Sequence, residues 1–338
     1  MAPAPAAPAQ VLCLGEALVD RLGPPGGDPA AGGDDHLGGA PANAACALAR
    51  LGTPAAFLGR LGSDAIGDAF ARLFAGRGVD TSALQRDGER PSRIVLVRRD
   101  AGGERQFGGF AGERGAGFAD QALAAAPLAA ALGPLLPPAR WLLVGTIPLA
   151  TPAAAAALEL ALQRAAAAGV AVAVDVNWRP TFWDPAADPA SGPGAHQLLR
   201  CRPLLEQAAL IKCAREEALW FCGSDDPALL SAALPGRPAV VVTDGAKPVR
   251  WCCGGARGAM APLPVTPVDT TGAGDAFTAG LLHGLCARPE LLKGTDAPAV
   301  EQLIRFAGAC GALVCQGSGS IDPQPSAAEV QARLNQAR

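Results

Sequence analysis

A carboxylate follows a glycine-rich turn in residues 269–277, DTTGAGDAF, and the two together are the strongest chemical signal in the chain. Gly272 and Gly274 flank Ala273. Asp275 comes next, and the apolar spacing beyond it predicts a helix. Glycines at the start of a helix expose backbone N–H groups at the positive end of the helix dipole, where anions bind. An acid at an anion site is unfavourable unless it takes part in chemistry.

The turn does not match the common nucleotide or calcium motifs. It lacks the lysine of G-x-x-x-x-G-K-[ST] and the third glycine of G-x-G-x-x-G, and a calcium loop needs more acids nearby. Two interpretations stay open. In the first, Asp275 only stabilises an ordinary helix start. In the second, Asp275 accepts a proton from a hydroxyl group that attacks a γ-phosphate, while the amides of residues 272–274 hold the transferring group.

Composition limits the possible partners. The chain has 338 residues, a formal net charge of −3, a pI near 5.7 and 50% hydrophobic residues, which suit one large α/β domain or two ordinary ones. Because the chain is not basic, nucleic acid is not expected as a partner. No apolar run reaches the roughly 18–20 residues that span a bilayer, so we expect no membrane partner.

The first residues predict a tail. Residues 1–10, MAPAPAAPAQ, lack the basic region and the continuous apolar core of a signal peptide. Their Ala/Pro composition predicts a short disordered segment. We therefore expect a cytoplasmic protein.

Short apolar runs alternate with longer Ala/Leu-rich runs along the rest of the chain. Strands separated by helices of about 10–15 residues indicate a mostly parallel sheet covered on both faces. Predicted strands cover residues 11–20, 55–62, 141–145, 170–177, 209–213 and 239–245. Predicted helices cover residues 41–52, 64–78, 152–168, 273–287, 299–315 and 326–336. A Gly/Pro/Asp-rich loop is predicted between the first strand and the first helix.

Residues 92–107 break this rhythm. The alternation in SRIVLVRRDAGGERQF predicts a β-hairpin that turns at residues 101–103. Such a hairpin is either an edge of the main sheet or part of a small lid outside it.

Two segments some 230 residues apart resemble the signatures of one enzyme family. DTTGAGDAFTAGLL (269–282) and GGAPANAACALARLG (38–52) are similar to the C-terminal and N-terminal signatures of the ribokinase-like (PfkB) carbohydrate kinases. The resemblance runs from about Val11 to the last helix. It implies a three-layer α/β/α fold with a mostly parallel central sheet and a small β lid. The kinase domain is then expected over residues 11–338, with the lid from about 16–38 and 91–112.

The resemblance also implies a role for each matching position. Asp275 corresponds to the catalytic base, and Gly272, Ala273 and Gly274 to the anion hole. The sugar-binding positions are Asp20, Gly38, Gly39 and Asn43. The ATP-binding positions are Thr243, Gly245, Gly272 and Gly274. The positions that hold a monovalent cation, usually K⁺, are Asp269, Thr271 and Gly319.

Other interpretations of some of these residues stay open. Taken alone, Asp20 fits a turn at a strand end and Asn43 fits a helix cap. Glu217 corresponds to the acid of the family's N-x-x-E segment, which acts near Mg²⁺ through water. Taken alone, it fits a solvated helix face. Ala214 stands where that segment has its Asn, so part of the polar network is missing or replaced.

Three further segments are most similar to the fructokinase branch of the family. They are GEALVD (15–20), GERQFGGF (103–110) and DVNWRPTFW (175–183), and they add Arg105, Asn177 and Arg179 to the sugar-binding set. The resemblance implies a monomeric or homodimeric kinase that uses ATP, Mg²⁺ and, as in many relatives, K⁺ to convert D-fructose to D-fructose 6-phosphate. The alternatives are a kinase for 2-keto-3-deoxygluconate, ribose or adenosine, and a catalytically inactive kinase-like regulatory protein.

Overall fold

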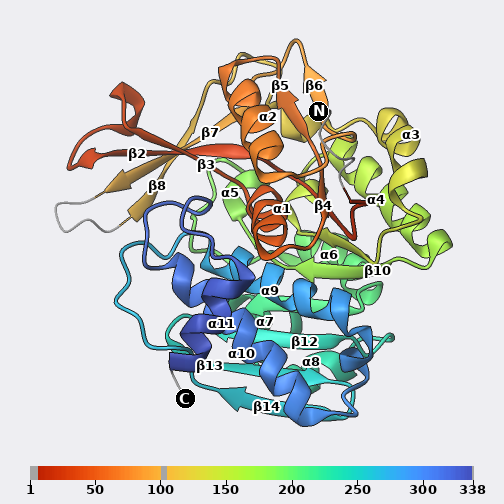
Figure 1. Ribbon diagram of the computed structural model, residues 1–338. Coiled ribbons are helices and arrows are strands. Elements are labelled where there is room, and N and C mark those ends of the chain that lie inside the picture. Colours follow the sequence, from red (N-terminus) through yellow and green to blue (C-terminus); the bar gives the residue numbers. More distant parts are fainter. Residues whose placement is uncertain (1–6, 100–104, 337–338) are drawn as a thin grey trace, which may run out of the picture.

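The computed structural model describes residues 7–99 and 105–336 as strands and helices arranged around a central sheet (Figure 1). The strands are β1 (Val11–Leu14), β2 (Leu18–Pro25), β3 (Asp34–Gly38), β4 (Ala55–Leu58), β5 (Arg60–Gly62), β6 (Gln85–Asp87), β7 (Arg93–Arg99), β8 (Arg105–Ala111), β9 (Trp141–Val144), β10 (Ala171–Asp175), β11 (Leu210–Ala214), β12 (Ala239–Asp244), β13 (Lys247–Cys253) and β14 (Ala256–Met260). The α-helices are α1 (Ala40–Leu51), α2 (Ala65–Arg77), α3 (Ala125–Leu135), α4 (Pro152–Ala168), α5 (Pro180–Trp183), α6 (Ala195–Glu206), α7 (Arg215–Cys222), α8 (Pro227–Ala232), α9 (Ala273–Ala287), α10 (Ala297–Val314) and α11 (Ala327–Gln336). Short 3₁₀ helices are η1 (Pro29–Ala31), η2 (Ala119–Ala122), η3 (Ile147–Ala150) and η4 (Pro289–Lys293).

The central sheet has the strand order β14-β13-β12-β11-β10-β9-β1-β4. Neighbouring strands from β12 to β4 are parallel, whereas β13 and β14 continue the sheet as antiparallel strands at one edge. Parallel neighbours require crossover connections, which the intervening helices supply. The predicted mostly parallel sheet is confirmed, and the antiparallel edge was not predicted.

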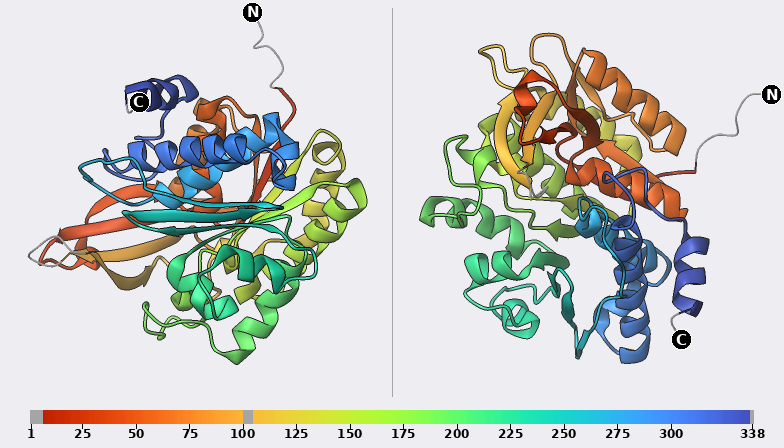
Figure 2. Two further views of the ribbon diagram at one scale, coloured as in Figure 1. Left: turned by 90° about the horizontal axis from the view of Figure 1, so that it is seen from below. Right: turned by 90° about the vertical axis from the view of Figure 1, so that its left-hand side faces the viewer.

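Side chains of the central sheet alternate between two hydrophobic cores. In β1, Val11 and Cys13 belong to one core with α1, α9 and α10, while Leu12 and Leu14 belong to the other with α3 and α4. Figure 2 shows these helical layers on opposite faces of the sheet. A strand covered on both faces has to be apolar at every position, as VLCL is. The predicted three-layer arrangement is confirmed.

The ends of several helices follow from local signals. Gly52 has a left-handed conformation, with φ 92°, and ends α1, which carries a proline in its first turn. Helix α4 likewise begins at Pro152 and ends before Gly169, at φ 71°. Helices α4 and α9 have the predicted bounds, and α1 begins one residue before the predicted start.

A second sheet of four strands projects from the body of the molecule in the order β3-β2-β7-β8 (Figure 1). Strands β7 and β8 are the two arms of the predicted hairpin and pair antiparallel. The predicted turn at residues 101–103 lies outside the described residues. Because β2 and β7 pair in parallel, the hairpin belongs to this second sheet and is not an edge of the main one. That the sheet works as a lid stays a prediction.

The prediction of one strand over residues 11–20 is wrong. Strand β1 ends at Leu14 in the central sheet, and β2 begins at Leu18 in the second sheet. The chain changes sheets at Gly15, which has φ 151° and whose absent Cβ would lie 2.6 Å from Pro41 Cγ. The segment predicted as a loop after Asp20 also contains β3, which pairs antiparallel with β2.

Some other boundaries also differ from the prediction. The expected disorder over residues 1–10 is wrong for Ala9, which is 2% exposed, and for Gln10, whose N–H donates to the Pro54 carbonyl at 2.8 Å. The predicted strand over residues 55–62 is divided into β4 and β5, which belong to different sheets. Within the described ranges, no helix combines the length and the apolarity needed to cross a membrane.

Candidate active site

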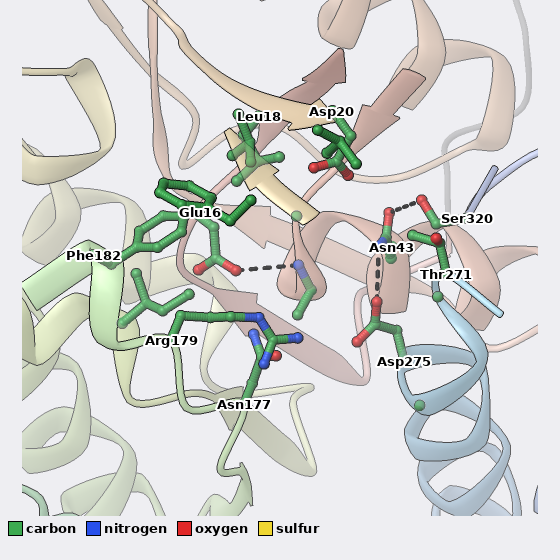
Figure 3. Close-up of a pocket in the computed structure, with 18 of the residues that line it drawn as sticks. Glu16, Leu18, Asp20, Asn43, Asn177, Arg179, Phe182, Thr271, Asp275 and Ser320 are labelled. Atoms are coloured by element: carbon green, nitrogen blue, oxygen red, sulfur yellow. Dashed lines mark hydrogen bonds between the residues drawn. The ribbon is translucent and has the colours of Figure 1, made fainter. Parts of the chain in front are cut away.

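One cavity of about 630 Å³ joins the second sheet to the start of α9. Its wall includes residues from β2, from the loop after β10 and from the turn before α9, three parts of the chain that are far apart in sequence. Figure 3 shows their side chains converging on this cavity. The polar side chains most important to the chemistry of this cavity are Glu16, Asp20, Asn43, Asn177, Arg179 and Asp275.

The turn before α9 has the geometry of an anion site. Gly272 is the N-cap with φ 78°, and a Cβ there would lie 2.5 Å from Ser320 Cβ, so only glycine fits. Gly272 and Gly274 line the cavity. The N–H of Ala273 donates to the Thr270 carbonyl at 3.3 Å, and Ala273 is not part of the wall. Of the three predicted anion-hole residues, the two glycines therefore border the cavity.

Asp275 is in the first turn of α9, and its side chain faces α1. Its Oδ2 accepts a hydrogen bond of 2.7 Å from Nδ2 of Asn43, whose Oδ1 accepts one of 2.9 Å from Ser320 Oγ (Figure 3). Burial raises the pKa of Asp275 to about 6, with a further rise from Asp175, against the opposing effects of Asn43, Lys212 and Arg179. Asn43 is inside α1, since its N–H donates to the Gly39 carbonyl, and is therefore not a helix cap.

A buried ion pair lies beside Asp275, and sequence analysis missed it. Lys212 Nζ contacts both carboxylate oxygens of Asp175, at 3.1 and 3.2 Å, and Thr278 Oγ1 donates to Asp175 at 2.8 Å. A Cβ on Gly274 would lie 2.9 Å from Lys212 Nζ, so the ammonium group sits against the start of α9. Burial alone would lower the pKa of Lys212, but the neighbouring carboxylates raise it, and Lys212 stays charged.

Glu217 is buried rather than on a solvated helix face. It is 7% exposed and lines the cavity. Its Oε1 accepts the N–H of Trp178 and its Oε2 accepts the N–H of Ala214, both at 2.7 Å. Ala214 stands where the N-x-x-E segment has its Asn. The second bond shows how α7 begins without that Asn, because the Glu217 side chain accepts the backbone N–H of Ala214. The first bond fixes the loop after β10.

That loop carries two of the predicted sugar-binding residues. Asn177 and Arg179 both line the cavity, and Asn177 has an uncommon positive φ of 42°. Arg179 is exposed and donates to the Trp178 carbonyl at 2.8 Å. The carboxyl ends of parallel strands are where ligands bind in open α/β sheets, and the loop after β10 is at such an end.

The second sheet supplies the opposite wall. Asp20 on β2 lines the cavity and pairs across the sheet with His36. Gly38 does not line it, but a Cβ there would lie 2.9 Å from Asp20 Oδ2. Gly39, with φ 102°, does line the cavity, and a Cβ there would lie 2.7 Å from the Glu16 carbonyl oxygen. These glycines therefore allow the close approach of β2 and the start of α1.

The residues predicted to hold a monovalent cation are brought together. Asp269 Oδ1 accepts hydrogen bonds from the N–H and the hydroxyl of Thr271, at 2.9 and 2.7 Å. Its Oδ2 accepts the N–H of Gly319 at 2.8 Å. The carboxylate thus ties two loops together beside the cavity, and its role toward a cation stays a prediction.

Besides Ala273 and Gly38, three further predicted residues are not placed in the cavity wall. Thr243 is the next-to-last residue of β12 and pairs with Ala214, and its hydroxyl donates to the Cys213 carbonyl at 3.4 Å. Gly245 follows in the turn after β12, with φ 53°. Arg105 begins β8, but its side chain lies outside the part of the chain that is described.

Sequence analysis also missed Glu16. This residue is 4% exposed, lines the cavity, and accepts the N–H of Ala40 on Oε1 at 3.1 Å. Burial raises its pKa to about 8. One signal was available: an acid placed directly after the first buried strand is at the ligand-binding edge of a parallel sheet.

Comparison with known proteins identifies the family. The model of the pfkB family carbohydrate kinases matches residues 8–327. The chain belongs to this family. Probable fructokinase-7 of Arabidopsis thaliana is 31% identical over 336 residues, covering 97% of this chain and 93% of the relative.

Solved structures agree with this membership of the pfkB family. Fructokinase from Xylella fastidiosa with bound ATP matches with a TM-score of 0.84 and 29% identity, over 97% of this chain and 98% of that one. Fructokinase from Vibrio cholerae O395 in its fructose, ADP and calcium form matches with a TM-score of 0.80 and 26% identity, over 96% and 99%. The predicted ribokinase-like fold and phosphotransferase class are confirmed.

Proposed function

We propose that this pfkB-family enzyme is an ATP-dependent fructokinase, which transfers the γ-phosphate of ATP to a primary hydroxyl group of D-fructose and gives ADP and D-fructose 6-phosphate. The observation that carries the proposal is the cavity that connects the partly buried Asp275 and the glycine turn of α9 with the polar wall of the second sheet. Fructokinases that are similar over nearly the whole chain, with fructose and nucleotide bound in one of them, support the choice of sugar.

Asp275 is proposed as the general base. Asn43 binds Oδ2 and orients the carboxylate, so Oδ1 can accept the proton of the attacking sugar hydroxyl. A pKa of about 6 leaves the group mostly ionised at neutral pH, yet makes it more basic than an ordinary aspartate. The acid beside the anion site thus serves the nucleophile, while the neighbouring backbone serves the phosphate.

The residues around α9 fit the phosphates of ATP. The first-turn amides of a helix have no acceptor within the helix, and Gly272 and Gly274 line the cavity at the start of α9. Lys212 adds a buried positive charge against Gly274, where it stabilises the charge on the transferring group. Thr243 and Gly245, at the end of β12, are proposed to bind the rest of the nucleotide.

Mg²⁺, when bound with ATP, neutralises the phosphate oxygens and orients the γ-phosphate for attack. Glu217 is proposed to hold it through water. This agrees with the geometry, because both oxygens of Glu217 already accept backbone N–H groups while the residue faces the cavity. The loop of Asp269, Thr271 and Gly319 is proposed as the K⁺ site.

Asp20, Gly39, Asn177 and Arg179 are proposed to bind the sugar, with Gly38 and Arg105 supporting that wall. The second sheet is proposed to close over the sugar and exclude water, which limits hydrolysis of ATP. A monomer or a homodimer is expected, and either is compatible with a site that one chain lines by itself.

A panel of acceptors at fixed Mg·ATP tests the function, with ADP release as the readout. We expect the highest kcat/KM with D-fructose. A higher value with 2-keto-3-deoxygluconate or ribose would reassign the substrate, and turnover with adenosine but not fructose would indicate a nucleoside kinase. If no acceptor raises ADP release above the rate without acceptor, the chain is a kinase-like regulatory protein and the proposal is wrong.

A further inference from the structure

Glu16 carries a buried carboxyl group beside the residues proposed to bind the sugar. It lies between β1 and β2, is 4% exposed, and also borders a small second cavity that Arg93 and Asp120 line. Figure 3 shows its carboxyl group between Phe182 and the start of α1, on the same side of the cavity as Arg179. Oε1 accepts the N–H of Ala40, the first residue of α1. Glu16 also lines the large cavity.

Two arginines, Arg93 and Arg179, lie near Glu16, and both are bonded to other groups. Arg93 borders the small cavity beside Glu16, but its guanidinium binds both oxygens of Asp120, at 3.0 and 3.1 Å. Three phenylalanine rings also pack against that guanidinium, with centroids 4.4–4.7 Å away. Arg179, from the loop after β10, is exposed and bonded to its own backbone segment. Among the described residues, no ion pair involves Glu16.

Two carboxylates act on Glu16. Asp120, which borders the small cavity, and Asp275, which borders the large one, both disfavour another anion there. Burial is the largest effect and raises the pKa of Glu16 to about 8, against the opposing effects of its own backbone N–H and that of Ala40. At neutral pH the group is therefore mostly a neutral carboxylic acid, which has one hydrogen to donate.

We infer that Glu16 is a sugar-binding residue that acts in its protonated form: Oε1 keeps the amide of Ala40, and the hydroxyl group on Oε2 donates a hydrogen bond to an oxygen atom of the sugar. This inference rests on the proposed function. It gives Asp275 and Glu16 different tasks, because Asp275 has to be ionised to accept a proton while Glu16 has to be neutral to donate a hydrogen bond. A neutral Glu16 also adds no negative charge beside the base.

The variant Glu16→Gln separates a donor from an acceptor. Glutamine keeps an oxygen for Ala40 and turns an NH₂ donor to the cavity, so we expect KM for D-fructose at pH 7 to stay within about threefold of wild type. Glu16→Ala removes the donor and is expected to raise this KM about 10- to 100-fold, with KM for ATP unchanged. Glu159→Gln, an exposed residue on α4, is the matched control and is expected to change nothing.

The pH dependence gives a readout that a purely structural role would not move. With a pKa of about 8, the neutral fraction of Glu16 falls about tenfold between pH 7 and pH 9, so the wild-type KM for fructose should rise about tenfold. Glu16→Gln should show no such rise. Because that variant retains the acceptor for Ala40, the difference cannot come from the start of α1. This measurement also stands if Glu16→Ala fails to fold.

Two results would overturn the inference. The first is a KM for fructose that rises as much in Glu16→Gln as in Glu16→Ala, which would indicate that Glu16 acts as an ionised hydrogen-bond acceptor. The second is a wild-type KM for fructose that does not change from pH 7 to pH 9. Both results can be obtained only with a protein that phosphorylates fructose. Failure of the proposed function looks different, because the wild-type protein then gives no fructose-dependent ADP at any pH.

Discussion

The two ends of the cavity are built in different ways. The α9 end consists of the backbone of Gly272 and Gly274, the carboxylate of Asp275 and the Lys212–Asp175 pair, all attached to the central sheet and its helices. The sugar end consists of side chains from β2, from the β1–β2 connection and from the loop after β10. The first end rests on a buried ion pair and is otherwise partly buried, whereas the other includes an exposed arginine and the wall of a projecting sheet.

From this difference we expect the α9 end to determine the rate of phosphate transfer and the sugar end to determine the binding of the sugar. Groups held in a buried network are preorganised, which is what the stabilisation of a transition state requires. Side chains on separate elements can be exchanged one at a time without disturbing that network, which suits the recognition of different sugars. Substitutions at the α9 end should therefore lower kcat, and substitutions at the sugar end should raise KM for the sugar.

Asp275→Asn should have the largest effect. Loss of the general base should lower kcat by roughly 10²–10⁴, whereas KM for fructose and ATP should stay within a few-fold. Steady-state kinetics measures both. Asp322→Asn, at an exposed position outside the cavity wall, is the matched control. A kcat within a few-fold of wild type would end the general-base mechanism.

Lys212→Met should lower kcat by roughly 10- to 100-fold, because the buried charge beside Gly274 is lost. It should also destabilise the fold by about 3–5 kcal/mol, since Asp175 is left as an unpaired buried charge. Chemical denaturation measures the free energy of unfolding.

The double variant Lys212→Met/Asp175→Asn separates the two effects. It removes the unpaired charge, so most of the stability should return while kcat stays low. If kcat returned together with stability, Lys212 would be a structural residue only, and the α9 end would depend on fewer charges than the comparison assumes.

The same division explains what the sequence could predict. The glycine turn and Asp275 are adjacent in the chain, so a local pattern was enough to identify them and to give the bounds of α9. The Lys212–Asp175 pair joins neighbouring strands from residues 37 positions apart. No periodicity identifies such a pair, because it depends on the register of β10 and β11.

Local patterns also failed where one pattern is compatible with two tertiary settings. Residues 11–20 read as one continuous strand, and only packing against Pro41 shows why the chain changes sheets at Gly15. Glu217 is on a short helix next to another acid, a pattern typical of a solvated face. It is buried because two backbone N–H groups from different segments need its oxygens.

Arg179→Ala should have the smallest effect on the kinetics. It tests both ends of the cavity, because Arg179 is at the sugar end and affects the pKa of Asp275 at the α9 end. The side chain is exposed, so we expect KM for fructose to rise only about 3- to 10-fold and kcat to stay within about threefold. Arg164→Ala, an exposed arginine on α4, is the matched control. A fall in kcat larger than the rise in KM would contradict the division between the two ends.

The pH profile of this variant sharpens the comparison. Asp275 has to be ionised, so the wild-type kcat/KM should fall as the pH drops through about 6. Arg179 lowers the pKa of Asp275, so its removal should raise that pKa and move the acid limb to higher pH. Since the charge acts across the cavity and is screened by water, the shift should shrink in high salt. If the pH at which kcat/KM falls is the same in the variant and the wild type, Arg179 does not affect the pKa of Asp275.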